Sequence, residues 1–357
     1  MPTPTSDIHG QMNGQNVRLF TLVNARGMQA QISELGAHLI SVTMPDEQGH
    51  RTELTLGHDT FEGWTHNAPY LGATCGRYGN RIAHGQFSLG DTSFTLATNN
   101  DPGGIPCHLH GGPGGFHTQV WHGAPITEEN RQGVRLTHTS PDGDEGYPGN
   151  LDVTVTYWLN DENELSWHAT ATTDKATPVN LINHTYWNLS GQPDTEITDH
   201  HIQIHADYFL PTTPGMIPTG EIRSVSDTPM DFTRPQRIGK NIDADYEPLQ
   251  LGAGYDHCWM LRDHHDGNTT AHTAAIVHHP GSGRTLEVLT NQPGVQFYTG
   301  NFLDGTTRGH NGHSFPRRSG LCLETQGFPD APNHPHFPST ILHPGETYRH
   351  DLIMRLS

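Results

Sequence analysis

The amino-acid sequence predicts an all-β protein, a large antiparallel β-sandwich. Short segments in which apolar and polar residues alternate recur along the whole chain, as expected for strands with one buried face. No stretch of about 12 residues or more has the 3.6-residue periodicity of an amphipathic helix. The 40 glycines and 26 prolines among 357 residues suit many short strands joined by tight turns. A parallel α/β barrel is disfavoured because the crossover helices that it needs are absent.

Alternation is clearest in two neighbouring segments that predict a β-hairpin. Residues 153–157 and 165–169 each alternate apolar with polar side chains, and the polar stretch 160–163 joins them as a turn. Further strands are expected at residues 18–23, 29–35, 86–89, 93–96, 134–139, 202–205, 285–290 and 321–325. The nearest approach to a helix, residues 61–70, is short and is interrupted by a glycine and a proline.

The sequence shows no internal repeat and no long linker. A chain of this length could form two domains, but large all-β sandwiches and barrels often exceed about 200 residues as one unit. We therefore expect a single domain that spans residues 1–357.

The charge of the chain argues against a nucleic-acid partner. There are 38 acidic residues against 19 Lys and Arg, a formal net charge of −19, and only two of the basic residues are lysines. Neutralising phosphates needs clustered Lys and Arg. The chain also has 28 histidines. At an unperturbed pKa of ~6.5, roughly a quarter of them would be charged at pH 7, so the net charge should change steeply between pH 6 and 7.

Apolar segments and cysteines bear on the location of the protein. The longest apolar runs, such as 258–261 and 274–277, have four residues, whereas a spanning helix needs about 20, so no membrane segment is expected. The first residues lack a basic region followed by an apolar one, so no secretory signal is expected. Four cysteines lie far apart without a C-x-x-C pair. These features favour free thiols in a reducing, cytoplasmic location.

Two glycine-rich segments carry candidate functional side chains. Residues 76–82, Gly-Arg-Tyr-Gly-Asn-Arg-Ile, place two arginines four residues apart on a tight backbone. In residues 108–115, His-Leu-His-Gly-Gly-Pro-Gly-Gly, an extended backbone would point His108 and His110 to the same side. A His-x-His pair can bind a metal, but a zinc site needs further ligands. Chance pairs are expected among so many histidines, so we predict no metal site.

Two further segments combine polar, aromatic and acidic residues. Residues 180–189, Asn-Leu-Ile-Asn-His-Thr-Tyr-Trp-Asn-Leu, contain three asparagines and two aromatic rings around His184. Hydrogen-bonding groups beside flat apolar faces suit a sugar site. In residues 320–330, a strand would place Cys322, Glu324 and Gln326 on one face. A carboxylate in the middle of a strand is costly if it is buried without a purpose.

Taken in order, these four segments resemble the aldose 1-epimerase (galactose mutarotase) family. Three further stretches, 227–232, 254–257 and 292–301, strengthen the resemblance, which runs from about residue 32 to residue 348. The resemblance implies a large antiparallel β-sandwich with the sugar in an open cleft. That fold agrees with the strand pattern.

The resemblance also implies a role for individual residues. Glu324 would take the proton of the anomeric hydroxyl, His184 would be the acid at the ring oxygen, and His110 would be a second sugar-contacting histidine. The residues implied to hold sugar hydroxyls are Asn80, Arg81, Asp256 and Gln296. Ile182, Cys258 with Trp259 and a polar insertion at 261–273 depart from the family pattern. These departures put the preferred sugar, rather than the activity, in question.

The implied reaction is mutarotation of a small-molecule aldose such as galactose or glucose. The C1 hydroxyl loses a proton while the ring oxygen gains one, the ring opens, and reclosure gives the other anomer. No metal, nicotinamide or other cofactor is needed. Because the acid must carry a proton near neutrality, we expect His184 to keep a pKa near or above ~6.5, helped by Glu324 or another carboxylate.

Three alternatives stay open from the sequence. A hexose-6-phosphate 1-epimerase would need clustered arginines, for which Arg77, Arg81 and the pair 317–318 are candidates. A non-catalytic sugar-binding relative on the same fold would have no reason to keep both Glu324 and His184. A metal-dependent hydrolase would be built on the histidine-rich segments. The sequence does not decide between a monomer and a homodimer.

Overall fold

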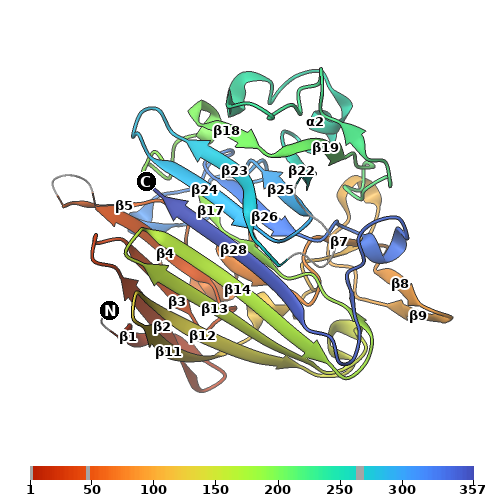
Figure 1. Ribbon diagram of the computed structural model, residues 1–357, viewed down its shortest axis with the longest axis horizontal. Coiled ribbons are helices and arrows are strands. Elements are labelled where there is room, and N and C mark those ends of the chain that lie inside the picture. Colours follow the sequence, from red (N-terminus) through yellow and green to blue (C-terminus); the bar gives the residue numbers. More distant parts are fainter. Residues whose placement is uncertain (1–2, 46–48, 263–268) are drawn as a thin grey trace.

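Three large antiparallel sheets form the framework of the fold, which the computed structural model describes for residues 3–45, 49–262 and 269–357 (Figure 1). The first sheet contains, in spatial order, β1 (Thr5–Met12), β2 (Gln15–Val23), β3 (Gln29–Ser33), β4 (Leu39–Pro45) and β5 (Arg51–Glu53). The second contains β11 (His122–Glu128), β12 (Arg131–Ser140), β13 (Leu151–Asn160), β14 (Glu164–Thr173), β28 (Tyr348–Leu356), β24 (Thr285–Thr290), β23 (His272–His278), β18 (His201–Ile204) and β21 (Gln236–Arg237). The third contains β17 (Tyr186–Trp187), β26 (Leu321–Gln326), β25 (Gly294–Tyr298), β22 (Asp256–Leu261), β19 (Ala206–Leu210) and β20 (Arg223–Ser224).

Smaller elements complete the fold. The two-stranded sheets pair β7 (Arg81–Ala83) with β10 (Cys107–Leu109), β6 (Ala73–Cys75) with β16 (Ile182–His184), β8 (Gln86–Leu89) with β9 (Thr92–Thr95), and β15 (Thr177–Pro178) with β27 (Ile341–Leu342). The α-helices of the described residues are α1 (Phe61–Thr65) and α2 (Glu247–Leu251). Neither has the length that a helix crossing a membrane would require, and no other helix in these ranges does. The prediction of an all-β antiparallel sandwich is confirmed.

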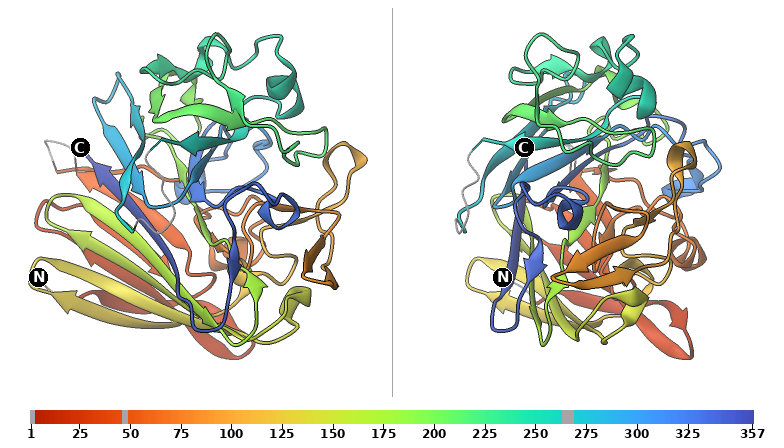
Figure 2. Two further views of the ribbon diagram at one scale, coloured as in Figure 1. Left: turned by 45° about the vertical axis from the view of Figure 1, so that its right-hand side comes forward. Right: turned by 90° about the vertical axis from the view of Figure 1, so that its right-hand side faces the viewer.

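One hydrophobic core joins the three sheets. Phe20 of β2, Val155 of β13 and Phe297 of β25 belong to the same cluster of buried side chains. The N-terminal strands therefore pack beside β11–β14, as Figure 2 shows for the red and yellow-green segments. The C-terminal strand β28 lies between β14 and β24 in the middle of the second sheet (Figure 1). The last strand of the chain thus connects the two halves of this sheet.

The predicted hairpin is confirmed as β13 and β14, in which Tyr157 lies opposite Trp167. Alternate residues of both strands are buried, because their apolar side chains face the core. The predicted strands 86–89 and 285–290 match β8 and β24, and the other expected strands differ from the observed ones by a few residues at their ends. The polar insertion predicted at 261–273 has its centre, residues 263–268, outside the described residues.

The segment 180–189 changes partner in the middle, and this change positions the site. Its first part, β16, pairs with β6, whereas its second part, β17, pairs with β26. Thr185 lies between the two strands. The end of β16 is thereby brought beside the centre of β26, so that His184 and Glu324 approach each other from different sheets.

Candidate active site

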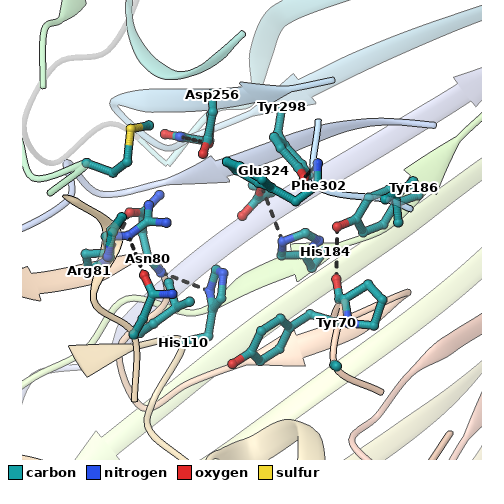
Figure 3. Close-up of a pocket in the computed structure, with 18 of the residues that line it drawn as sticks. Tyr70, Asn80, Arg81, His110, His184, Tyr186, Asp256, Tyr298, Phe302 and Glu324 are labelled. Carbon is teal, nitrogen blue, oxygen red and sulfur yellow. Dashed lines mark hydrogen bonds and ion pairs between the residues drawn. The ribbon is translucent and has the colours of Figure 1, made fainter. Parts of the chain in front are cut away.

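A cavity of about 470 Å³ opens beside β26, β25 and β22 (Figure 3). Side chains from segments far apart in the sequence line it. Every predicted site residue is among them: Asn80, Arg81, His110, His184, Asp256, Gln296 and Glu324. The structure therefore brings all seven predicted residues together in one cavity.

Glu324 lines the cavity from the middle of β26. Cys322, Glu324 and Gln326 share one face of this strand, as predicted, while Leu321 and Leu323 join the hydrophobic core on the other. Glu324 is 2% exposed, and its Oε2 atom has no hydrogen-bond partner in the described part of the chain. An acceptor that is buried and unpartnered is costly. It is, however, available to a hydroxyl group that enters the cavity.

His184 faces Glu324 across a short gap, with 3.6 Å between Nε2 and Oε1 (Figure 3). Its ring is enclosed by other rings: Tyr186 stacks on it at 5.1 Å between centroids, and His110 meets it edge-on at 5.1 Å. Its Nδ1 atom lies 3.6 Å from the sulfur of Cys322. The imidazole is therefore held in one orientation, with Nε2 directed at the carboxyl group.

The expectation that His184 keeps a pKa near or above 6.5 is wrong. Burial lowers the pKa of His184 to about 4, because the enclosed ring loses the solvation of its charged form. Burial also raises the pKa of Glu324 well above its usual range; the Asp256 carboxyl adds to this effect and Arg81 opposes it. Both shifts favour a neutral pair, with a shared proton on Glu324, over the charged pair of carboxylate and imidazolium.

His110 is fixed by the backbone of Asn80. The Asn80 N–H donates to Nδ1 of His110 over 3.1 Å, and the His110 N–H donates to the Asn80 carbonyl over 3.0 Å. A neutral ring that accepts at Nδ1 carries its proton on Nε2. His110 therefore offers an N–H donor to the cavity.

The prediction that His108 and His110 point to the same side is wrong. The strand β10 ends at Leu109, and His110 has a positive φ of 51°, which breaks the alternation of side chains. His108 instead packs edge-on against Tyr147, with 5.4 Å between the ring centroids. Only His110 reaches the cavity.

Three polar side chains form another wall of the cavity. Gln296 lies directly opposite Glu324 in the β25–β26 pair and donates from Nε2 to Oδ1 of Asp256 over 2.7 Å. Burial raises the pKa of Asp256, although Arg81 and the Gln296 hydrogen bond both oppose the shift. Arg81 donates from Nε to Oδ1 of Asn100 over 3.2 Å. This wall combines a cation, a carboxyl group and an amide, which suits hydroxyl groups that both donate and accept.

The sequence reasoning missed several aromatic residues of the cavity. Tyr70, Tyr186, Tyr298 and Phe302 all line it. Tyr186 and Tyr298 could have been found, because each lies two residues after a predicted site residue, His184 or Gln296, and a continuous strand would place both members of each pair on one face. Tyr70 has a φ of 60° in a loop, and Phe302 lies beyond the end of β25, so no strand pattern points to them.

The asparagines of segment 180–189 have a different role from the sugar contacts suggested for them. Asn180 accepts from the Gly327 N–H and donates to the Gly79 carbonyl. Asn183 donates to Tyr157, and Asn188 donates to several carbonyls. All three are buried and hold neighbouring segments together. Of the two aromatic residues in the segment, Tyr186 lines the cavity and Trp187 belongs to the core.

The arginines proposed for a phosphate group do not gather at the cavity. Arg77 is 2% exposed and donates to Ser140, Thr177 and nearby carbonyls. Arg318 pairs with Asp243, and Arg317 donates to a backbone carbonyl. Arg81 is therefore the one lysine or arginine among the described residues that line this cavity.

Two groups of side chains in the described ranges lie close enough to share a metal ion. The first is His110, His184 and Glu324. Metal ligation by a neutral histidine needs a free lone pair, but the Nδ1 lone pair of His110 accepts from Asn80 and its Nε2 carries the proton. This leaves two ligands, one fewer than the three protein ligands that a catalytic zinc site takes. The donor set does not fit a metal centre.

The second group is Asp199, His200 and His279. His200 accepts at Nε2 from the Leu189 N–H, and His279 accepts at Nδ1 from the Ser282 N–H. Each ring therefore donates its remaining N–H to Asp199, over 2.9 and 3.2 Å. Both rings use their lone pairs within the protein, so this group is a structural hydrogen-bond cluster.

The fold and the cavity define a class of protein: a β-sandwich with a buried carboxyl–imidazole pair in a polar, aromatic-lined site. The sequence profile of a family described as Aldose 1-epimerase matches residues 18–355. The chain is 45% identical to a galactose mutarotase of Bos taurus over 92% of this chain and 91% of that one. It is 39% identical to an aldose 1-epimerase of Escherichia coli over 94% of both chains.

Among solved structures, the crystal structure of a galactose 1-epimerase from Lactobacillus acidophilus superposes with a TM-score of 0.85 at 29% identity, covering 99% of this chain and 98% of that one. A homologue from C. elegans gives 0.83 at 30% identity over 95% of this chain and 98% of its own. The chain belongs to the aldose 1-epimerase family. The resemblance noted in the sequence is thereby confirmed.

Proposed function

We propose that the protein is an aldose 1-epimerase, or mutarotase, that interconverts the α and β anomers of free hexoses such as galactose and glucose. The observation that carries the proposal is the buried pair of Glu324 and His184, which line the cavity with 3.6 Å between His184 Nε2 and Glu324 Oε1. Ring opening needs one group that removes a proton and another that supplies one, and this pair offers both.

In the proposed reaction, Glu324 is the base at the C1 hydroxyl and His184 is the acid at the ring oxygen. The two pKa shifts favour a resting form with the shared proton on Glu324, and the reactive form, carboxylate with imidazolium, differs from it only in the position of that proton. Proton removal at C1 and proton donation at the ring oxygen break the ring bond and give the open aldehyde. Rotation about C1–C2 and reclosure with reversed proton transfers yield the other anomer.

The low pKa of His184, about 4, favours the donor step. An imidazolium whose pKa is lowered by burial is a stronger acid than a solvated one, and it gives its proton more readily to the weakly basic ring oxygen. The raised pKa of Glu324 likewise makes its carboxylate a stronger base. Burial thus strengthens both partners in the directions that the reaction needs.

The remaining predicted site residues would bind the sugar. His110 would donate from Nε2 to a sugar oxygen near the reacting centre. Asn80, Arg81, Asp256 and Gln296 would hold the other hydroxyls. No metal or nicotinamide enters the proposed reaction.

Neutral hexoses are preferred over hexose 6-phosphates as substrates. A phosphate group would need clustered arginines, and Arg77, Arg317 and Arg318 are engaged elsewhere. A non-catalytic sugar-binding relative is disfavoured because it would gain nothing from burying an unpartnered carboxyl group next to an imidazole.

We also propose that the protein acts in the cytoplasm. All four cysteines, Cys75, Cys107, Cys258 and Cys322, are buried and free, as expected in a reducing compartment. The partner would be a small-molecule aldose rather than a nucleic acid, because the net charge is −19 and lysines are almost absent.

Polarimetry of freshly dissolved α-galactose and α-glucose tests the proposed function. The wild-type protein should accelerate anomerisation of at least one of them, and the Glu324→Gln variant should lose the effect. Glucose 6-phosphate in the same assay separates the phosphate alternative, and the rate should be unchanged by a chelator. A wild-type protein that leaves both free sugars at their spontaneous rate would contradict the proposal.

A further inference from the structure

Two adjacent asparagines, Asn99 and Asn100, contact the segments that carry two of the predicted sugar-binding side chains. Asn99 binds the backbone directly before His110, and Asn100 binds the side chain of Arg81. Neither asparagine belongs to the site residues predicted from the sequence. We propose that Asn99 and Asn100 are positioning residues, which fix the direction of His110 and of Arg81 in the active site. This inference rests on the proposed function.

Asn99 completes the hydrogen bonds of Leu109, the last residue of β10. The Leu109 N–H donates to Oδ1 of Asn99 over 2.7 Å, and Nδ2 of Asn99 donates to the Leu109 carbonyl over 3.0 Å. In an antiparallel pair, every second residue directs its N–H and C=O away from the partner strand. Leu109 lies opposite Arg81 in the pair with β7 and is 9% exposed, so both groups would be costly to leave unpaired. The side-chain amide takes the place of a third strand.

This contact reaches His110 through a single peptide unit. The chain leaves β10 immediately after Leu109, at the positive φ of His110. The other constraint on His110 is its pair of hydrogen bonds with the Asn80 backbone, next to β7. The direction of the His110 ring therefore depends on two contacts: the Asn80 backbone next to β7, and Asn99. Loss of the Asn99 amide would leave the Leu109 backbone free to move. The Cα atom of the next residue, His110, from which its side chain projects, would then be less well fixed.

Asn100 acts on Arg81 directly. Its Oδ1 atom accepts from Nε of Arg81 over 3.2 Å, and the sulfur of Cys107 lies 3.6 Å from the same oxygen. Because the guanidinium group is planar and rigid, a fixed Nε sets the plane in which the other N–H groups point. Asn100 itself lines the cavity. An acceptor at this point therefore controls how Arg81 presents its donors to a sugar.

The backbone links the two contacts. The Cys107 N–H donates to the Asn100 carbonyl over 2.7 Å, and the Asn99 and Asn100 N–H groups both approach the Cys107 carbonyl. Residues 99 and 100 thus extend the β7–β10 pair as a short third segment. One loop sets the positions of a residue on β7 and of a residue just after β10.

Double-mutant cycles test whether each asparagine acts through its assigned partner. The cycles are Asn100→Ala with Arg81→Ala, and Asn99→Ala with His110→Ala, measured by galactose anomerisation. We expect Asn100→Ala to raise KM about tenfold with little change in kcat. The free energy of a hydrogen bond to a charged group corresponds to a change of about this size. Asn99→Ala should lower kcat by a similar factor. In the Arg81→Ala and His110→Ala backgrounds, the respective asparagine substitution should have almost no further effect.

Conservative variants separate positioning from simple stabilisation. Asn100→Asp keeps the Oδ1 acceptor and should restore a KM near that of the wild type. Asn99→Asp keeps the acceptor for the Leu109 N–H but loses the Nδ2 donor; it carries the Asn99 test if the alanine variant does not fold. Asp101→Asn is the matched control, since Asp101 is the exposed next residue and should leave kcat and KM unchanged.

The outcomes distinguish this inference from the proposed function. Additive effects in both cycles, with a wild-type protein that is active, would overturn the positioning role and leave the mutarotase activity intact. A wild-type protein that neither anomerises nor binds galactose would overturn both. Non-additive cycles together with rescue by Asn100→Asp would establish the positioning role.

Discussion

Acid should destabilise this protein strongly, because many of its histidines are buried in the neutral form. Burial lowers the pKa of His9 and of five further histidines to about 4 and that of His257 to about 3, against 6.5 for an unperturbed ring. The five are His108, His117, His184, His200 and His350. Between these values the unfolded chain binds more protons than the folded one. Stability is therefore complete above pH 6.5 and falls as the pH decreases toward 4.

The magnitude follows from linkage. For a group with pKa values of 6.5 unfolded and about 4 folded, lowering the pH from 7.5 to 5.5 removes about 1 kcal/mol of folding free energy. The six most buried of these groups together remove roughly 6–8 kcal/mol. Glu324 and Asp256, whose pKa values burial raises, take up protons in the folded state and offset part of this loss. The remaining net loss, on the order of several kcal/mol, is comparable to the whole stability of many domains.

Urea unfolding at pH 7.5 and pH 5.5, followed by tryptophan fluorescence, measures this loss. With an m-value of about 3 kcal/mol/M, the midpoint should fall by roughly 1–2 M. His38→Phe should reduce the pH dependence, because His38 is fully buried, its pKa is lowered well below 6.5, and neither ring nitrogen has a hydrogen-bond partner in the described ranges. His122→Phe is the control at an exposed position. Equal midpoints at the two pH values would refute the reasoning.

Three further predictions concern the site and the thiols. Glu324→Gln should lower kcat for galactose anomerisation by about 10²–10⁴-fold, because an amide cannot accept the C1 proton. If polarimetry finds that the variant keeps more than a tenth of the wild-type kcat, Glu324 is not the base. The enzymatic kcat/KM, corrected for the spontaneous rate, should show no histidine inflection near pH 6.5 in assays completed before unfolding, because the pKa of His184 is about 4; an inflection near 6.5 would contradict this. The native protein should not react with a thiol reagent such as Ellman's reagent until urea is added, because all four cysteines are buried, and fast labelling of the native protein would be the opposite result.

The fold could be predicted from the sequence where local pattern and tertiary burial agree. The hairpin of β13 and β14 is one example, because each strand has one face in the core and the turn is polar. Segment 180–189 could not be divided correctly, since its break at Thr185 comes from pairing with β6 on one side and β26 on the other. Such partners lie far away in the sequence. The single-domain organisation over residues 1–357 stays a prediction.

The composition of the site was predictable, but its electrostatics were not. The seven residues could be found because the residue types of each motif, and the order of the motifs along the chain, can be read directly from the sequence. The pKa of His184 depends instead on Tyr186, His110 and other groups that only the fold brings to it. The steep titration expected between pH 6 and 7 is likewise reduced, because histidines with a pKa of about 4 do not titrate there.

The same burial that costs stability in acid can explain how one pair serves both directions of the proposed reaction. Forward and reverse mutarotation require identical machinery with the proton returned to its starting place after each turnover. In water, such a pair would exist as carboxylate and imidazolium. The carboxylate would be a weak base and the imidazolium a weak acid. In this cavity burial shifts the Glu324–His184 pair toward its neutral arrangement, because it raises one pKa and lowers the other. A proton that moves easily between the partners lets either anomer be the substrate, and no external proton source is needed to complete the cycle.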